Sequence, residues 1–319
     1  TAQERSAKET HQGKTLALVV SQSAGGSSDH LARLVGRHIG RNLSGNPAVI
    51  VRNMPGAGGL TAANYLYNVA PRDGGTIGMI EQSVHAMQLF KNKGLLADVK
   101  KFHWLGRVTS NNAALVARSN HPVQKIEDAF KNELVVSATG QSSQMRWNIL
   151  KKLTGVKFKL IVGHQGTSEA GLALERGEID AFSAPWIVFR VGHADWLRDR
   201  KVNVLLQTGL DRAADLPDVP RVVDLARNDE QRQILELFSQ PEKVGRSLIA
   251  PPETPAERVA ELRSAFAAMF KAADFQAELA TMRLSLEPLN GEALQDFIFK
   301  SFDYAPDLIE KAEALAKPD

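Results

Sequence analysis

Residues 16–29 read LALVVSQSAGGSSD, an apolar run followed at once by a loop of small and hydroxyl-bearing residues. Apolar residues then recur at helical spacing, at Leu31, Leu34, Val35 and Ile39. This order predicts a buried strand, a short loop and an amphipathic helix. We expect Ser27 or Ser28 to cap that helix, and Asp29 to lie in its first turn, where a carboxylate is favoured.

The same order of strand, small-residue loop and helix recurs along the chain. Strands are predicted at residues 16–20, 49–51, 76–80, 134–136, 158–162, 179–182 and 202–206, with a turn-rich middle. Helices dominate the last third, over residues 229–238, 255–271 and 293–302. Such alternation is typical of α/β folds with mostly parallel sheets. Because 319 residues suffice for two domains, we predict two α/β lobes of similar construction.

Composition excludes several classes of function. The chain has 39 Lys and Arg against 36 Asp and Glu, a net charge of +3, and these residues are dispersed. A nucleic-acid partner is therefore not favoured. No apolar run approaches the roughly 18 residues that a membrane span needs. The absence of cysteine excludes thiol catalysis, disulfides and iron–sulfur clusters, and the eight histidines form no close-spaced ligand cluster. We expect no metal and no cofactor.

The first thirteen residues are polar and contain no apolar core of a signal peptide. We therefore expect that no signal peptide is present in this sequence. Two interpretations remain open from composition alone: a cytoplasmic protein, or a mature chain after cleavage.

The loops that follow the predicted strands have the chemistry of an anion site. In parallel α/β sheets, ligands bind beyond the carboxyl ends of the strands. A helix that starts there presents unpaired N–H groups and the positive end of its dipole to a carboxylate or phosphate. The residues that would form two such sites are Gly25, Gly26, Ser27 and Ser28 in one lobe, and Gly140, Ser142 and Ser143 in the other.

Motifs of catalysis are incomplete. A P-loop ending at Gly13-Lys14-Thr15 would need glycine at position 8, where Lys8 stands. A dinucleotide fingerprint at residues 56–61 would need glycine at position 61, which is Thr61. The sequence contains neither G-x-S-x-G nor H-E-x-x-H. We therefore expect the chain not to be an enzyme.

Several motifs in order resemble a known family. Residues 19–33, VVSQSAGGSSDHLAR, and residues 51–59, VRNMPGAGG, resemble the first two strand–loop segments of the tripartite tricarboxylate transporter receptors, also called Bug proteins. Further similar segments are APRDG at 70–74, GEIDA at 177–181, LPDVP at 216–220 and a return strand within 245–255. The resemblance extends from Leu16 to about Leu308.

The resemblance implies a periplasmic receptor with the two-lobed type II "Venus flytrap" fold, each lobe a mixed, mostly parallel sheet flanked by helices. It implies a monomer that captures a small organic carboxylate and delivers it to a separate permease with a large and a small membrane subunit. One lobe would comprise residues 1–108 and 223–319 and the other residues 109–222, with the ligand cleft between them. Carried onto this sequence, the resemblance adds site residues Ala24, Asp29 and Ser83 in the first lobe, and Thr139, Gln141, Gly166, Thr167 and Asp180 in the second. Gln22 and His164, which we also expect in the site, stand where this sequence departs from the usual pattern of the family.

Other interpretations of the same fold stay open. One is an enzyme for a small anionic substrate, in which His164 and Asp180 act as acid and base. Another is a receptor whose closed form is recognised by a signalling protein. The sequence also leaves open whether Arg146 or Arg190 pairs with a second carboxylate. We expect hinges near residues 106–108 and somewhere after Thr208.

Overall fold

The computed structural model describes residues 15–164, 166–283 and 287–318; for Gln141 and Ser142 it describes the backbone only. The chain divides into two compact units. The first contains the residues up to Ser110 together with Val244–Asp303, and the second contains Asn111–Lys243 together with Tyr304–Asp319.

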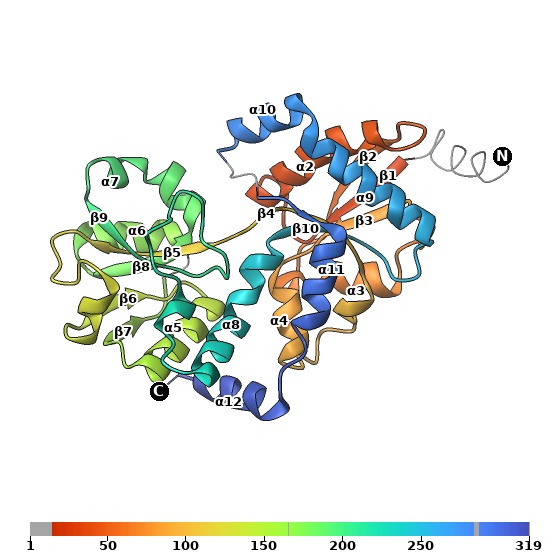
Figure 1. The fold of residues 1–319 in the computed structure, drawn as a ribbon. Helices are drawn as coiled ribbons and strands as arrows, with labels where there is room; N and C mark the ends of the chain where they lie inside the picture. The colour runs from red at the N-terminus through yellow and green to blue at the C-terminus, as the bar shows by residue number, and fades with distance from the viewer. Residues whose placement is uncertain (1–14, 165, 284–286, 319) are drawn as a thin grey trace. The chain divides into compact units, whose positions relative to one another are not determined.

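The first unit is built on a six-stranded sheet (Figure 1). Its elements are β1 (Thr15–Val20), α2 (Ser27–Ile39), η1 (Gly40–Asn42), β2 (Ala48–Asn53), η2 (Ala57–Gly59), α3 (Leu60–Asn68), β3 (Thr76–Met79), α4 (Ser83–Leu89), η3 (Val99–Lys101), β4 (His103–Thr109), β10 (Arg246–Ala250), α9 (Ala256–Lys271), α10 (Ala273–Thr281), β11 (Leu289–Asn290) and α11 (Gly291–Lys300). The strand order is β11-β4-β10-β3-β1-β2. Strands β1, β2 and β3 are parallel, whereas β10 runs antiparallel to both β3 and β4.

Helices cover both faces of this sheet, and the alternation of side chains along β1 shows why. Leu16, Leu18 and Val20 are buried in one core cluster with residues of α2, α9 and α10. Val19 points the other way, into a cluster with residues of α3, α4 and α11. Because both faces of β1 are apolar, the strand is a continuous hydrophobic run, as is usual for parallel strands.

The second unit is built on a five-stranded sheet with the order β7-β6-β8-β5-β9. Its elements are β5 (Ala113–Arg118), η4 (Ile126–Phe130), β6 (Leu134–Ser137), α5 (Gln141–Thr154), β7 (Phe158–Ile161), α6 (Thr167–Arg176), β8 (Ala181–Pro185), η5 (Val188–Gly192), α7 (Ala194–Arg198), β9 (Val202–Gln207), η6 (Val222–Leu225), α8 (Asp229–Val244) and α12 (Pro306–Ala316). Strand β6 is parallel to β7 and β8, and β5 runs antiparallel to β8 and β9. The two mixed, mostly parallel sheets confirm the predicted fold class.

The unit boundaries differ from the expected lobes at residues 109–110, which belong to the first unit, and in two longer segments. Residues 223–243 and 304–319 were expected in the first lobe, but they belong to the second unit. The reason is packing: Ile234 and Leu235 of α8 and Ala312 of α12 lie in the same buried cluster as Trp147 of α5.

The turn-rich middle contains two strands that we did not predict, β4 and β5. Gly106, near which we expected a hinge, lies inside β4, opposite Leu248 and Asn290. Its φ of 146° is one that L-residues rarely adopt, and a Cβ there would lie 2.1 Å from the Phe266 ring. Gly106 therefore permits close packing of α9 against the sheet.

We predict that Gly106→Ala lowers the free energy of unfolding by about 2–4 kcal/mol, because it adds backbone strain to overpacking. Urea unfolding followed by circular dichroism would measure this. The matched control is Gly192→Ala, where no atom lies within 4 Å of the new Cβ. Similar unfolding midpoints for the two variants would contradict the packing role of Gly106.

Candidate functional site

Three loops of the first unit leave its sheet at one edge. Val20 of β1 is level with Asn53 of β2 and Met79 of β3 in the parallel register. The loop after β1 enters α2, and the loop after β3 enters α4 at half-buried Ser83. The predicted site residues of this unit, Gln22, Ala24, Gly25, Gly26, Ser27, Ser28, Asp29 and Ser83, therefore belong to one edge of the sheet.

Asp29 holds the loop after β1 in place. Its carboxylate accepts hydrogen bonds from Gly25 N–H at 2.9 Å, Arg33 Nε at 3.0 Å and Asn53 Nδ2 at 2.9 Å. The same Asn53 amide donates to the Gln22 carbonyl at 3.0 Å. The Arg33 hydrogen bond and the Gly25 backbone hydrogen bond hold the pKa of Asp29 far below its usual range. Asp29 was predicted to bind ligand, but its oxygens are engaged by donors of the protein itself.

The start of α2 differs from the expectation. Gly26, not a serine, is the N-cap, and no side chain caps the helix. The Ser27 and Ser28 hydroxyls instead contact the guanidinium of Arg246, with Arg246 Nη2 donating to Ser27 Oγ at 3.1 Å and Nη1 donating to Ser28 Oγ.

Arg246 is a residue of this edge that the sequence analysis missed. It is the first residue of β10, which is antiparallel to β3 with Ile249 opposite Gly78. Continuing that register by three residues places Arg246 opposite Glu81, just beyond the end of β3. Burial lowers the pKa of the half-buried Arg246 guanidinium, and the Glu81 carboxylate opposes that shift. Glu81 itself accepts a hydrogen bond from Gln22 Nε2.

The second unit has a corresponding edge beyond β6 and β7. These strands are parallel, with Ser137 level with Ile161, and Ser137 Oγ lies 2.9 Å from His164 Nδ1. The loops that follow enter α5 after Gly140 and α6 after Gly166. Predicted residues Thr139, Gly140, Gln141, His164, Gly166 and Thr167 thus share this edge, while the side chains of Gln141 and Ser142 lie outside the described residues.

Next to this edge lies a buried ion pair. Arg146 of α5 pairs with Glu242 of α8, and Thr208 Oγ1 donates to the same carboxylate oxygen at 3.1 Å. Burial raises the pKa of Glu242, against the opposing effect of Arg146. One helical turn before Arg146, the buried Ser143 hydroxyl has no hydrogen-bond partner among the described residues. The Arg190 guanidinium pairs with Asp215 at 3.1 Å. Both arginines that the sequence offered for a second carboxylate therefore already have an acidic partner.

Asp180, predicted as a site residue with Thr139, lies level with Val135 of β6, toward the other edge of this sheet. It precedes β8, whereas the ligand edge follows the strands. Its carboxylate pairs with Arg118 at 2.6 Å and accepts the Val135 N–H at 3.0 Å, at the beginning of β6. The structure therefore does not bring His164 and Asp180 together as an acid–base pair.

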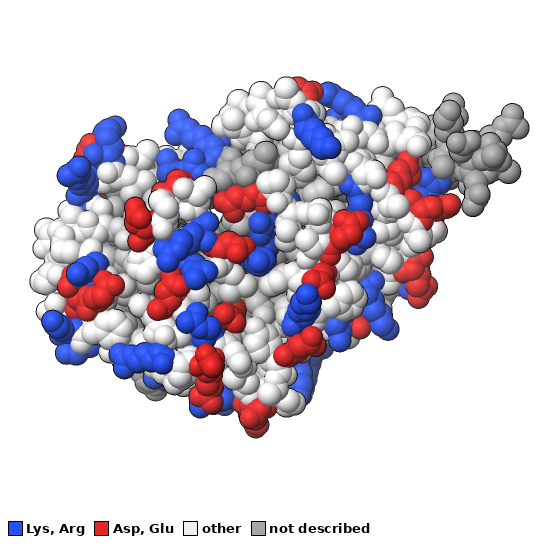
Figure 2. All heavy atoms as spheres, viewed as in Figure 1, with Lys and Arg blue, Asp and Glu red and all other residues white. Residues whose placement is uncertain are grey.

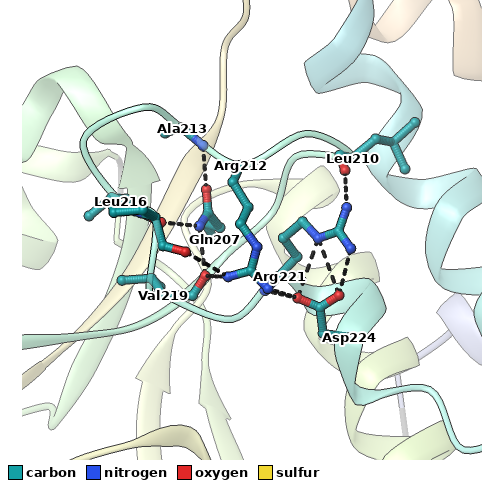
Figure 3. A network of polar contacts seen from close by, with 9 residues as sticks. Gln207, Leu210, Arg212, Ala213, Leu216, Val219, Arg221 and Asp224 are labelled. Carbon is teal, nitrogen blue, oxygen red and sulfur yellow. Dashed lines mark hydrogen bonds and ion pairs between the residues drawn. The ribbon is translucent and has the colours of Figure 1, made fainter.

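A polar network holds the loop after β9 (Figure 3). The buried Gln207 amide donates to the Leu216 carbonyl at 2.8 Å and the Val219 carbonyl at 2.7 Å, and its oxygen accepts from Ala213 N–H at 2.7 Å. Arg212 and Arg221 both reach the Asp224 carboxylate. The LPDVP segment at 216–220 thus has a framework role in positioning this loop.

The described residues show no concentration of one charge on the face drawn in Figure 2 and no cluster of metal ligands. On the face shown in Figure 2, cationic and anionic side chains are interspersed. Within the described ranges, no three His, Asp or Glu side chains are grouped so as to hold a metal ion. Nor does any helix in those ranges have the length and apolar character to cross a membrane.

Solved structures share this fold over nearly the whole chain. A TctC solute-binding protein from Polaromonas has a TM-score of 0.70 at 21% identity, with 93% of this chain and 98% of that chain covered. MatC from Rhodopseudomonas palustris, solved with malate, gives 0.61 at 23% identity over 95% and 99% of the chains. R. palustris Rpa4515, solved with adipate, gives 0.63 at 18% identity over 95% and 97%.

The fold is thus that of two-lobed periplasmic solute-binding proteins. The family model of the tripartite tricarboxylate transporter family receptor, TctC, matches residues 31–313. The chain belongs to this family, as the resemblance of its motifs implied. The family comprises substrate-binding receptors rather than enzymes.

We predict that Asp29→Asn lowers the free energy of unfolding by about 1–3 kcal/mol at pH 7, because hydrogen bonds to a buried carboxylate are lost. The folded-state pKa of Asp29 lies below its ordinary value of 3.8, so this stabilisation is present above about pH 4 and is lost as pH falls further. Urea unfolding at pH 7, 4 and 3 would measure the difference in free energy of unfolding between wild type and Asp29→Asn. This difference should become smaller below pH 4.

The control is Asp296→Asn, which removes an exposed carboxylate paired with Lys300 and should change stability by less than about 1 kcal/mol. If the free energies of unfolding of wild type and Asp29→Asn differ equally at pH 7 and pH 3, the role assigned to the Asp29 charge is contradicted.

Proposed function

We propose that this protein is a periplasmic receptor that captures a small organic carboxylate and delivers it to a tripartite tricarboxylate-type permease with one large and one small membrane subunit. Family membership supports the receptor role, and the bound malate and adipate of two proteins of similar fold support the ligand class. We propose further that the receptor acts as a monomer without a cofactor.

The observation that carries the proposal is the same in both units: the loops that follow the parallel strands lead into helices whose N-termini are accessible. Gly25, Gly140 and Gly166 all have positive φ, and no atom lies within 4 Å of the position of a Cβ at any of them. The backbone is therefore accessible beside the first turns of α2, α5 and α6. Such helix starts favour a carboxylate through their free N–H groups and their dipole.

The proposed mechanism is closure of one lobe over a ligand held by the other. The ligand-binding residues would come from both strand-end edges, and the ligand would lie in a cleft between the lobes. A ligand can shift an open–closed equilibrium only by contacts that it makes in the closed form alone. The second set of contacts is therefore what would drive closure, and the permease would recognise the closed form.

A thermal-shift screen of ligand-free protein against mono-, di-, tricarboxylic and aromatic acids would test the receptor role, with sugars and neutral amides as controls. At 100 times its dissociation constant, a ligand adds about 2.7 kcal/mol to the free energy of unfolding. We expect a raised melting temperature with one class of acids. If the protein instead converts a candidate acid to a product, or no acid raises the melting temperature, the receptor proposal fails.

Capture by both units predicts that a single hydroxyl deletion in either one weakens binding. Ser27→Ala and Thr139→Val each remove one hydroxyl, and the loss of a hydrogen bond to a charged ligand group should weaken binding by about 10-fold or more. Isothermal titration calorimetry with the acid that shifts the melting temperature most would measure this. Ser264→Ala, an exposed serine of α9, is the control. Unchanged affinity in Thr139→Val would remove the second unit from the proposed site.

A further inference from the structure

Arg246 differs in its partners from Arg258 and Arg263, two other buried or half-buried arginines of the first unit. Arg258 pairs with Glu261 and Arg263 pairs with Glu292. Within the described residues, Arg246 donates hydrogen bonds to the hydroxyls of Ser27 and Ser28 and forms no ion pair. The hydrogen-bond partners of its guanidinium are thus neutral, and the Glu81 carboxylate interacts with it without an ion pair.

A partly buried guanidinium without an anion is energetically unfavourable. Arginine cannot be neutralised by loss of a proton, so the desolvation of its charge persists. Glu81 lies near enough to oppose the pKa shift of Arg246, but its carboxylate accepts the Gln22 amide and forms no ion pair with Arg246. An external anion that reached Arg246 would offset this desolvation.

The direction of the guanidinium places such an anion at the start of α2. Both terminal nitrogens, Nη1 and Nη2, contact the first two hydroxyls of the helix. A guanidinium carries five N–H donors, so these two contacts leave three for a ligand. A carboxylate there would meet the guanidinium, the serine hydroxyls and the free N–H groups of the helix together.

We propose that Arg246 is the specificity-determining residue of the first unit and makes a direct ionic contact with the ligand carboxylate. The inference rests on the proposed receptor function and names the group that would distinguish acids from neutral solutes of the same shape. The ligand class is an organic acid with at least one ionised carboxylate; its neutral amide would be rejected. Any further negative charge of the ligand would lie away from Glu81.

Isothermal titration calorimetry of the full chain with malate, adipate, citrate and benzoate, each beside its amide, would test the proposal. The variants are Arg246→Gln, Arg246→Lys and the control Arg41→Gln. Arg41 follows the far end of α2, about 20 Å away at 1.5 Å per residue, and its removal changes net charge equally. We expect Arg246→Gln to weaken acid binding at least 30-fold, since loss of one partner of a buried ion pair has effects of this size. Arg246→Lys should be intermediate, and Arg41→Gln should be within about twofold of wild type.

Two further measurements distinguish charge recognition from a purely structural role. Removal of an unpaired cation should leave the melting temperature of ligand-free Arg246→Gln unchanged or higher, and should weaken the dependence of acid affinity on NaCl concentration. Glu81→Gln removes a competing negative charge and should strengthen acid binding by about two- to fivefold.

Each outcome bears on the proposal. If wild type binds an acid and Arg246→Gln binds it equally well, the proposal is overturned while the receptor function stands. A lowered melting temperature of ligand-free Arg246→Gln with unchanged salt dependence would also overturn it, because Arg246 would then only brace the two serines. If wild type binds none of the acids, both the receptor function and this inference fail.

Discussion

The parallel pairing of β1 with β2 and β3 is the constraint on which the chemistry of the first unit depends. It brings Val20, Asn53 and Met79 to one level, so three loops leave the sheet at the same edge. The chain enters α2 there, and the first N–H groups of a helix have no partner within it. The antiparallel β10 adds a second consequence, because it begins where the parallel strands end. Its first side chain, Arg246, is thereby brought to the helix start that the parallel strands create.

Asp29 and Arg246 lie at this edge and carry opposite charges, and their roles differ because their hydrogen-bond partners differ. Asp29 accepts from Gly25, Arg33 and Asn53, and so its charge is used to hold the loop. Arg246 contacts hydroxyls only, and so its charge is balanced by no group at hydrogen-bond distance. A buried charge whose hydrogen-bonding groups all have protein partners stabilises the fold, whereas a charge without an ion-pair partner can bind a ligand of opposite charge. Residue type and position alone do not separate these roles, because both side chains lie at the start of α2.

The sequence predicted the strand–loop–helix segments well, because buried parallel strands are continuous apolar runs and their loops are rich in glycine and serine. It did not predict β4 or β5, because short strands between turns have no period of their own to distinguish them from loops. The position of Arg246 at this edge was missed because the residue begins a strand, and in a fully parallel sheet the beginnings of the strands face away from the ligand. The same rule, applied to Asp180, shows why it belongs to the far edge: it precedes β8. The loops were predictable from local sequence. The direction of each strand was not, because it depends on which neighbouring strands it pairs with in the sheet.

Arg146 of the second unit and Arg246 of the first differ in their partners, and this difference gives an order to ligand capture under the proposed function. In the second unit, Arg146 pairs with the buried Glu242, and the Ser137 hydroxyl contacts the His164 ring at the strand ends. In the first unit, Arg246 has no such partner within hydrogen-bond distance. A cation without an ion-pair partner attracts an anion over about 8 Å at physiological salt, whereas a hydroxyl group acts only at contact. The first unit would therefore bind the acid before closure, and the hydroxyl and backbone N–H groups of the second would then add the contacts that favour the closed form.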